Sequence, residues 1–158
     1  MNRVHVFMLA VVFGLVGVTP LVAETPKELP EAATRELKTL KGKWRIEKVL
    51  HFDRETTPGS ADDPLIFEFK GNTIRFSESS SGTVVELDPS TTPKCLDFSP
   101  LQGFGIFKKD SIYESVYKLE GETLSWAVYI GPGKNRPVGF DKPTDAWVKV
   151  IVLKRVKE

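Results

Sequence analysis

The sequence predicts an all-β protein, an antiparallel up-and-down barrel of about eight strands preceded by one short helix. Three observations support this fold class. Polar and apolar residues alternate with a period of two in short segments from Trp44 onward. Turns rich in glycine, proline and serine separate these segments, and no β-α-β pattern occurs among them. Short antiparallel strands in this number favour a closed barrel over a sandwich, because closure removes both exposed edges of the sheet.

Residues 1–23 have the pattern of a secretory signal peptide. Arg3 precedes an apolar run from Val6 to Val18, and Ala23 supplies a small residue at the expected cleavage point. A membrane anchor is the alternative, but a spanning helix needs about 20 apolar residues and this run is shorter. We therefore expect export to the periplasm, the cell surface or the medium, with no stable membrane span after cleavage.

The rest of the chain is expected to form a leader and one domain. Residues 24–37 are a polar leader and the start of a short helix, and residues 38–158 are the barrel domain. The helix is expected from Glu31 to Leu40, because alanine and leucine recur there at helical spacing. Gly42 suits the end of this helix.

The strands are expected where apolar and polar residues alternate between turn-forming residues. In the first of them, Trp44, Ile46, Leu50 and Phe52 are expected on one face, which Lys48 interrupts. The expected strands are residues 44–52, 65–70, 73–77, 82–87, 94–98, 112–119, 122–130 and 147–155, and the longest loops are residues 53–64, 100–110 and 131–143.

Three residues carry a resemblance to a known family. Gly42 and Trp44 after a short helix, with Arg155 on the last strand, resemble the signature of the lipocalins and their calycin relatives. In those families the arginine lies across the tryptophan and closes the base of the barrel. The resemblance implies that the three residues form a structural latch, with direct contact to a ligand as the alternative. A guanidinium above an indole face is attractive through a cation–π interaction.

Further short motifs narrow this resemblance to the lipocalin-like domain found in many copies in planctomycete bacteria, mostly in exported proteins without known function. The match covers residues 38–155 and implies the fold and export, but no activity. The segment from Leu101 to Ser111 departs from the group, because it is longer and more aromatic than expected. The motifs are Leu40–Trp44 (LKGKW), Leu87–Pro89 (LDP), Pro93–Asp97 (PKCLD), Tyr117–Leu124 (YKLEGETL), Arg136–Phe140 (RPVGF) and Leu153–Arg155 (LKR).

The inward-facing side chains of such a barrel either line a cavity for one small ligand or fill the interior, and the sequence leaves both open. A cavity predicts a carrier of a small apolar or amphipathic molecule. A filled barrel predicts a structural or interaction module that contacts a protein or an envelope polymer through loops 53–64 or 131–143. The candidate ligand-lining residues are Phe67, Phe69, Phe76, Trp126 and Val128.

Asp97 and Arg136 both lie in motifs of the resemblance. One hypothesis pairs them at the barrel mouth, where the arginine could also bind a ligand carboxylate through two hydrogen bonds. The other hypothesis, which the sequence favours, is a structural ion pair that fixes the loop around Arg136.

Composition argues against several functional classes. Removal of residues 1–23 takes away Arg3 and His5, which leaves 21 basic residues, 21 acidic residues and the single histidine His51. A neutral chain without a basic block is not expected to bind nucleic acid. One histidine and one cysteine, Cys95, supply neither a metal-ligand cluster nor a recognisable nucleophile–base pair. We therefore expect no enzyme activity, no metal and no cofactor.

Overall fold

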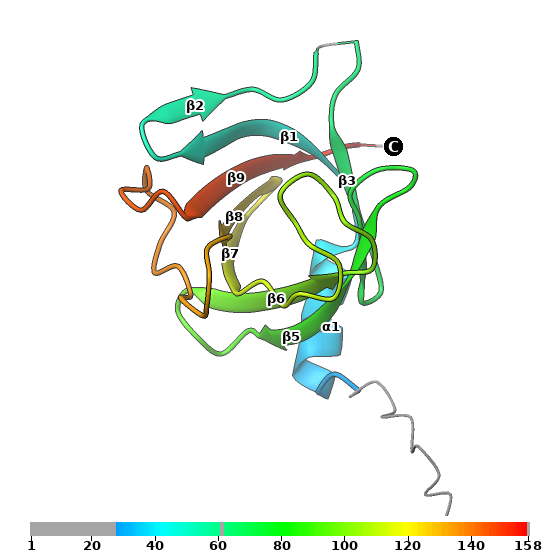
Figure 1. Ribbon diagram of the computed structural model, residues 1–158. Coiled ribbons are helices and arrows are strands. Elements are labelled where there is room, and N and C mark those ends of the chain that lie inside the picture. Colours follow the sequence, from blue (N-terminus) through cyan, green and yellow to red (C-terminus); the bar gives the residue numbers. More distant parts are fainter. Residues whose placement is uncertain (1–27, 61, 158) are drawn as a thin grey trace, which may run out of the picture.

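The computed structural model describes residues 28–60 and 62–157 (Figure 1). The predicted signal peptide, residues 1–23, and the first part of the predicted leader lie outside the described residues.

Helix α1 (Glu31–Leu40) has the bounds that the sequence predicts. Its buried face consists of Ala33, Leu37 and Leu40, which recur at helical spacing. The helix ends because Lys41 leaves the helical conformation and Gly42 follows with a φ of +118°, a value that side chains with a Cβ rarely adopt.

Within the described residues, nine antiparallel strands follow the helix, and eight of them close into a barrel. The barrel runs in sequence order from β1 through β3 to β9, and β9 pairs back with β1. The all-β barrel predicted from the alternation is therefore confirmed. The strands are β1 (Gly42–His51), β2 (Arg54–Thr56), β3 (Ile66–Lys70), β4 (Thr73–Arg75), β5 (Ser81–Asp88), β6 (Lys94–Pro100), β7 (Ser115–Glu120), β8 (Thr123–Tyr129) and β9 (Val148–Arg155).

The short strand β2 lies in a segment for which the sequence predicts only a loop, and that prediction is wrong for its three residues. β2 pairs with the end of β1, from Val49 opposite Thr56 to His51 opposite Arg54. All three β2 side chains are exposed, so no apolar alternation marks the strand in the sequence.

Strand β1 contains an irregularity that changes which side chains face inward. Its register with β9 shifts between Ile46 and Lys48, so one extra β1 residue is accommodated there. Beyond this shift Val49 packs against the barrel core, whereas Leu50 packs against a separate cluster. The prediction that Leu50 and Phe52 share the face of Trp44 is therefore wrong, and Phe52 is half exposed.

That separate cluster lies on the outside of the barrel. Successive strand partners place Leu50 opposite Val150, Val150 opposite Ala127, and Ala127 opposite Val116. Phe140, from the loop between β8 and β9, packs against this row together with Cys95 and Val148. The loop covers this part of the sheet, which explains why the sequence is apolar on both faces of β9.

The interior is filled by aromatic side chains, and both ends of the barrel are covered. Leu37 and Leu40 of α1 join the core at one end. At the other end the β6–β7 loop, drawn in yellow-green across the opening in Figure 1, places Phe104 and Phe107 against Phe76, with ring centroids 5.5 and 6.1 Å apart. This loop contains the longer, aromatic segment that the sequence singled out.

Candidate functional site

The base of the barrel is where Trp44 and Arg155 meet helix α1. The Arg155 guanidinium carbon lies 4.1 Å from the centroid of the Trp44 ring system. The indole Nε1 donates a hydrogen bond of 2.8 Å to the carbonyl of Leu40, and Arg155 donates bonds of 2.7 Å to the carbonyls of Thr39 and Lys41. Carbonyls at a helix C-terminus lack partners within the helix, so these two side chains satisfy three of them.

Gly42 completes this group. A Cβ at this position would lie 3.4 Å from Nη1 of Arg155, and the φ of +118° already disfavours any other residue. The structure thus brings together Gly42, Trp44 and Arg155, whose contacts are with the protein's own backbone and core.

A second polar contact attaches α1 to the barrel wall. The Glu36 carboxylate accepts hydrogen bonds of 2.6 Å from Lys94 Nζ and 2.8 Å from the Tyr117 hydroxyl. Burial, and then the hydrogen bond to the Glu36 carboxylate, raise the pKa of Tyr117 well above its ordinary value.

This raised pKa predicts a loss of stability in alkali. The folded state holds the Tyr117 proton more tightly than the unfolded state, so its contribution is complete below about pH 10 and is lost as the pH rises further. Urea unfolding at increasing pH is expected to show a steeper loss of unfolding free energy for the wild type than for Tyr117→Phe. Tyr129→Phe is the control, because that hydroxyl donates to the carbonyl of Pro132, and it should follow the wild type. Equal slopes for Tyr117→Phe and the wild type would contradict the assignment.

The five residues predicted to line a ligand cavity are all buried in the core. Their rings contact one another: Phe67 and Phe76 have centroids 5.2 Å apart, and Phe67 and Trp126 6.3 Å apart. Phe98 adds a contact of 5.1 Å to Trp126. Phe69 and Val128 are 1% and 0% exposed. These side chains occupy the interior that a ligand would need.

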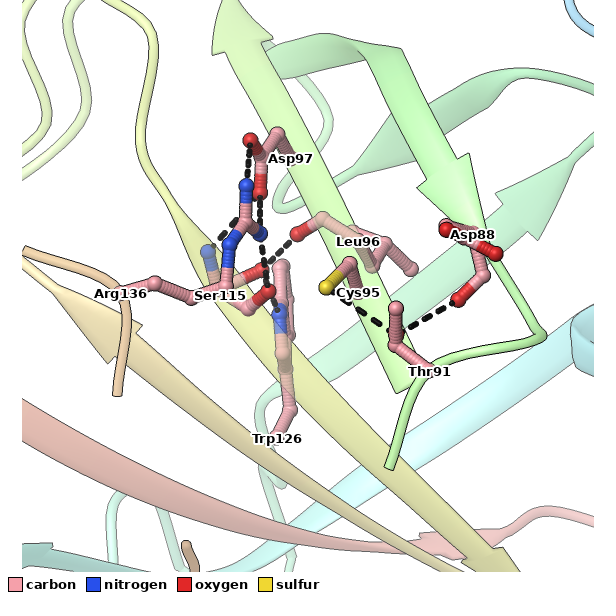
Figure 2. Close-up of polar contacts among 8 residues, drawn as sticks. All are labelled: Asp88, Thr91, Cys95, Leu96, Asp97, Ser115, Trp126 and Arg136. Atoms are coloured by element: carbon pink, nitrogen blue, oxygen red, sulfur yellow. Dashed lines mark hydrogen bonds and ion pairs between the residues drawn. The ribbon is translucent and has the colours of Figure 1, made fainter. Parts of the chain in front are cut away.

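The structure brings Asp97 and Arg136 together between β6 and β7 (Figure 2). Leu96 and Phe98, which flank Asp97 on β6, belong to the barrel core, so the Asp97 side chain lies on the outer face of the strand. Arg136 Nη1 donates to Asp97 Oδ1, and Nη2 donates to Oδ2 over 2.8 Å. The hydrogen bond to Asp97 raises the pKa of Arg136, so this guanidinium stays charged. The side chain of Asp97 is 4% exposed.

The backbone of Ser115 explains why this ion pair lies between β6 and β7. Regular β6–β7 pairing stops after Cys95 and Val116 and returns as an isolated bridge between Phe98 and Tyr113. In the gap, the Ser115 N–H donates to Asp97 Oδ1 over 3.0 Å, and its carbonyl accepts from Arg136 over 2.9 Å.

The Ser115 side chain also forms hydrogen bonds. Its hydroxyl donates to the carbonyl of Leu96 and accepts a 2.8 Å bond from Trp126 Nε1. No sequence pattern identifies Ser115, since a lone serine in a strand has nothing to distinguish it. Asp97 and Arg136 therefore replace backbone hydrogen bonds that the interrupted ladder lacks, which favours the structural alternative for the pair.

The two residues with the most reactive side chains occupy ordinary structural positions. Cys95 is buried with the Thr91 hydroxyl 3.2 Å from its sulfur (Figure 2), and His51 Nε2 lies 2.8 Å from the carbonyl of Ala146. Among residues 28–60 and 62–157, no cluster of histidine, cysteine, aspartate and glutamate could hold a metal ion.

A groove that the sequence analysis did not identify lies outside the barrel, between α1 and the β3–β4 turn. Its volume is about 740 Å³. Thr34, Leu37 and Lys38 form part of the helix wall, and Lys70 lies on the opposite side. Sequence patterns alone could not reveal this groove, because nothing in them places the helix beside that turn.

No family model, curated protein or solved structure matches this chain. In the part of the chain that the structure describes, no helix combines the length and apolarity needed to cross a membrane.

Proposed function

We propose that this protein is an exported, non-catalytic binding module that holds a small apolar or amphipathic molecule on the outside of a filled barrel. The observation that carries this proposal is the contrast between the packed interior and the open groove beside α1. The interior aromatic rings contact one another and are covered at both ends, whereas the groove is open to solvent and has leucine side chains in its wall. Export is supported by the signal-like pattern of residues 1–23.

Native mass spectrometry of protein purified gently from its own host tests this proposal. We expect an extra mass that leaves when the protein unfolds. The same experiment on Thr34→Trp should lose that mass, because Thr34 is exposed on the helix wall and an indole there fills the groove.

Ala32→Trp is the matched control. Ala32 is also exposed on α1 but lines a different groove, beside Leu87 and Pro89. An extra mass retained by Thr34→Trp would contradict the assignment to the groove beside the β3–β4 turn.

A second candidate is an interaction module, and it is favoured by the exposed apolar side chains at the covered end of the barrel. The strand connections place these residues at the end of the barrel that lies away from α1, where a protein or an envelope polymer could contact them. Absence of any bound mass in the host-purified protein would favour this candidate. The residues are Phe52, Leu65, Leu101, Ile106, Ile112 and Trp147, each between 41% and 59% exposed.

A further inference from the structure

We infer that the groove between α1 and the β3–β4 turn selects amphipathic anions, with the ligand's apolar chain along the leucines and its carboxylate between Lys38, Lys41 and Lys70. This inference rests on the proposed function and adds the chemical class of the ligand.

The apolar part of the groove comes from α1 and the segment before it. Leu37 is only 6% exposed, and Leu29 is partly buried against the core. Thr34, Leu37 and Lys38 recur at helical spacing, so one helix face forms a wall, and Lys41 extends it beyond the end of the helix. An apolar chain placed here would contact leucine side chains and the methylene stems of the lysines.

The charged residues that line the groove are mostly basic. Three lysines, Lys38, Lys41 and Lys70, line it against one acid, Glu28. None of the three lysines forms an ion pair with any residue that the structure describes, so their ammonium groups are available to a ligand; the described lysines that do form ion pairs are Lys48, Lys94, Lys109 and Lys118. Unpaired ammonium groups around an apolar wall are complementary to an anionic head on an apolar chain.

The end of α1 does not oppose this anion as strongly as a free helix C-terminus would. The carbonyls of Thr39, Leu40 and Lys41 would otherwise present partial negative charge beside the groove. They already accept hydrogen bonds from Arg155 and Trp44, which reduces the partial negative charge that faces the groove. The latch at the barrel base therefore weakens the repulsion between the helix end and a carboxylate.

The groove on the other side of α1 provides an internal contrast. It is lined by Glu28, Glu86 and Asp88 and by no lysine. The two grooves that flank the helix thus differ in charge, and only the lysine-lined groove suits an anion.

Isothermal titration calorimetry with decanoate and with the uncharged analogue decanol, each kept monomeric, tests the inference on the purified protein. We expect decanoate to bind at least tenfold more tightly than decanol. The double variant Lys38→Glu/Lys70→Glu should weaken decanoate binding by about tenfold or more. Each exposed ion pair contributes modestly, but this variant removes two of them and places two negative charges beside the carboxylate. Added salt should weaken decanoate binding but not decanol binding.

Two controls separate this effect from changes in folding or net charge. The double variant Lys134→Glu/Lys142→Glu makes the same change in net charge at two exposed lysines outside the groove and should leave decanoate affinity unchanged. Thr34→Trp should abolish binding of both probes, and Ala32→Trp should abolish neither. Circular dichroism of each variant should match the wild type.

The outcomes distinguish the inference from the proposed function. Equal affinity for decanoate and decanol, lost in Thr34→Trp, would overturn the anion selectivity while leaving the binding function in place. Failure of both probes to bind, or binding that Thr34→Trp does not change, would overturn both. Binding to vesicles of anionic lipid without binding to monomeric decanoate would overturn the inference in favour of a membrane surface.

Discussion

Replacing Trp44 with alanine is expected to lower the free energy of unfolding by about 3–5 kcal/mol. The indole is 0% exposed, so the substitution creates a cavity in the core. It also removes the hydrogen bond to the Leu40 carbonyl and the ring beneath the Arg155 guanidinium. Urea unfolding followed by far-ultraviolet circular dichroism measures the loss without relying on tryptophan fluorescence.

Trp147→Ala is the matched control for Trp44→Ala, because Trp147 is 51% exposed. Its effect should stay near the size usual for surface substitutions, about 0.5 kcal/mol. A Trp44→Ala variant with near-wild-type stability and a selective loss of ligand binding would contradict the structural assignment.

Replacing Asp97 with asparagine is expected to cost about 3 kcal/mol, the lower end of the range for breaking a buried ion pair. The side chain of Asp97 is 4% exposed, and that of Arg136 is 28% exposed, so the arginine keeps some contact with water. Asparagine can still accept the Ser115 N–H, but it cannot neutralise the guanidinium. We also expect faster proteolysis of the β8–β9 loop, because Arg136 anchors that loop to β6.

Glu47→Gln is the control for Asp97→Asn. It removes an ion pair with Arg45 in which both side chains are more than one third exposed, so a much smaller effect is expected. An Asp97→Asn variant with unchanged unfolding free energy and unchanged loop proteolysis would show that the pair has no structural role.

The architecture was predictable because its signals are local. Alternation in β3 and β4 comes from strands with one face in the core, and the spacing of Ala33, Leu37 and Leu40 marks the helix. The partners of Trp44 and Asp97 followed from the resemblance, since Arg155 and Arg136 are distant from them in the sequence.

Other features depend on tertiary contacts that no local pattern records. The register shift in β1 reverses the inward face after Lys48, and only its pairing with β9 reveals it. The bonds of Ser115 depend on the interruption between β6 and β7. Whether the interior was filled depended on the path of the β6–β7 loop, which brings Phe104 and Phe107 over the opening.

Closure of the barrel by the first and last strands has a consequence for how the chain folds. Lys41 and Arg155, which meet at the base, are 114 positions apart. Contacts of such long range are slow to form, because a large loop must close first. Synthesis proceeds from the N-terminus, so β1 and β8 remain open sheet edges until β9 has emerged. A chain truncated before Val148 should therefore fail to close and should associate through these edges, while the complete chain acquires its helix latch and its last strand pairing together.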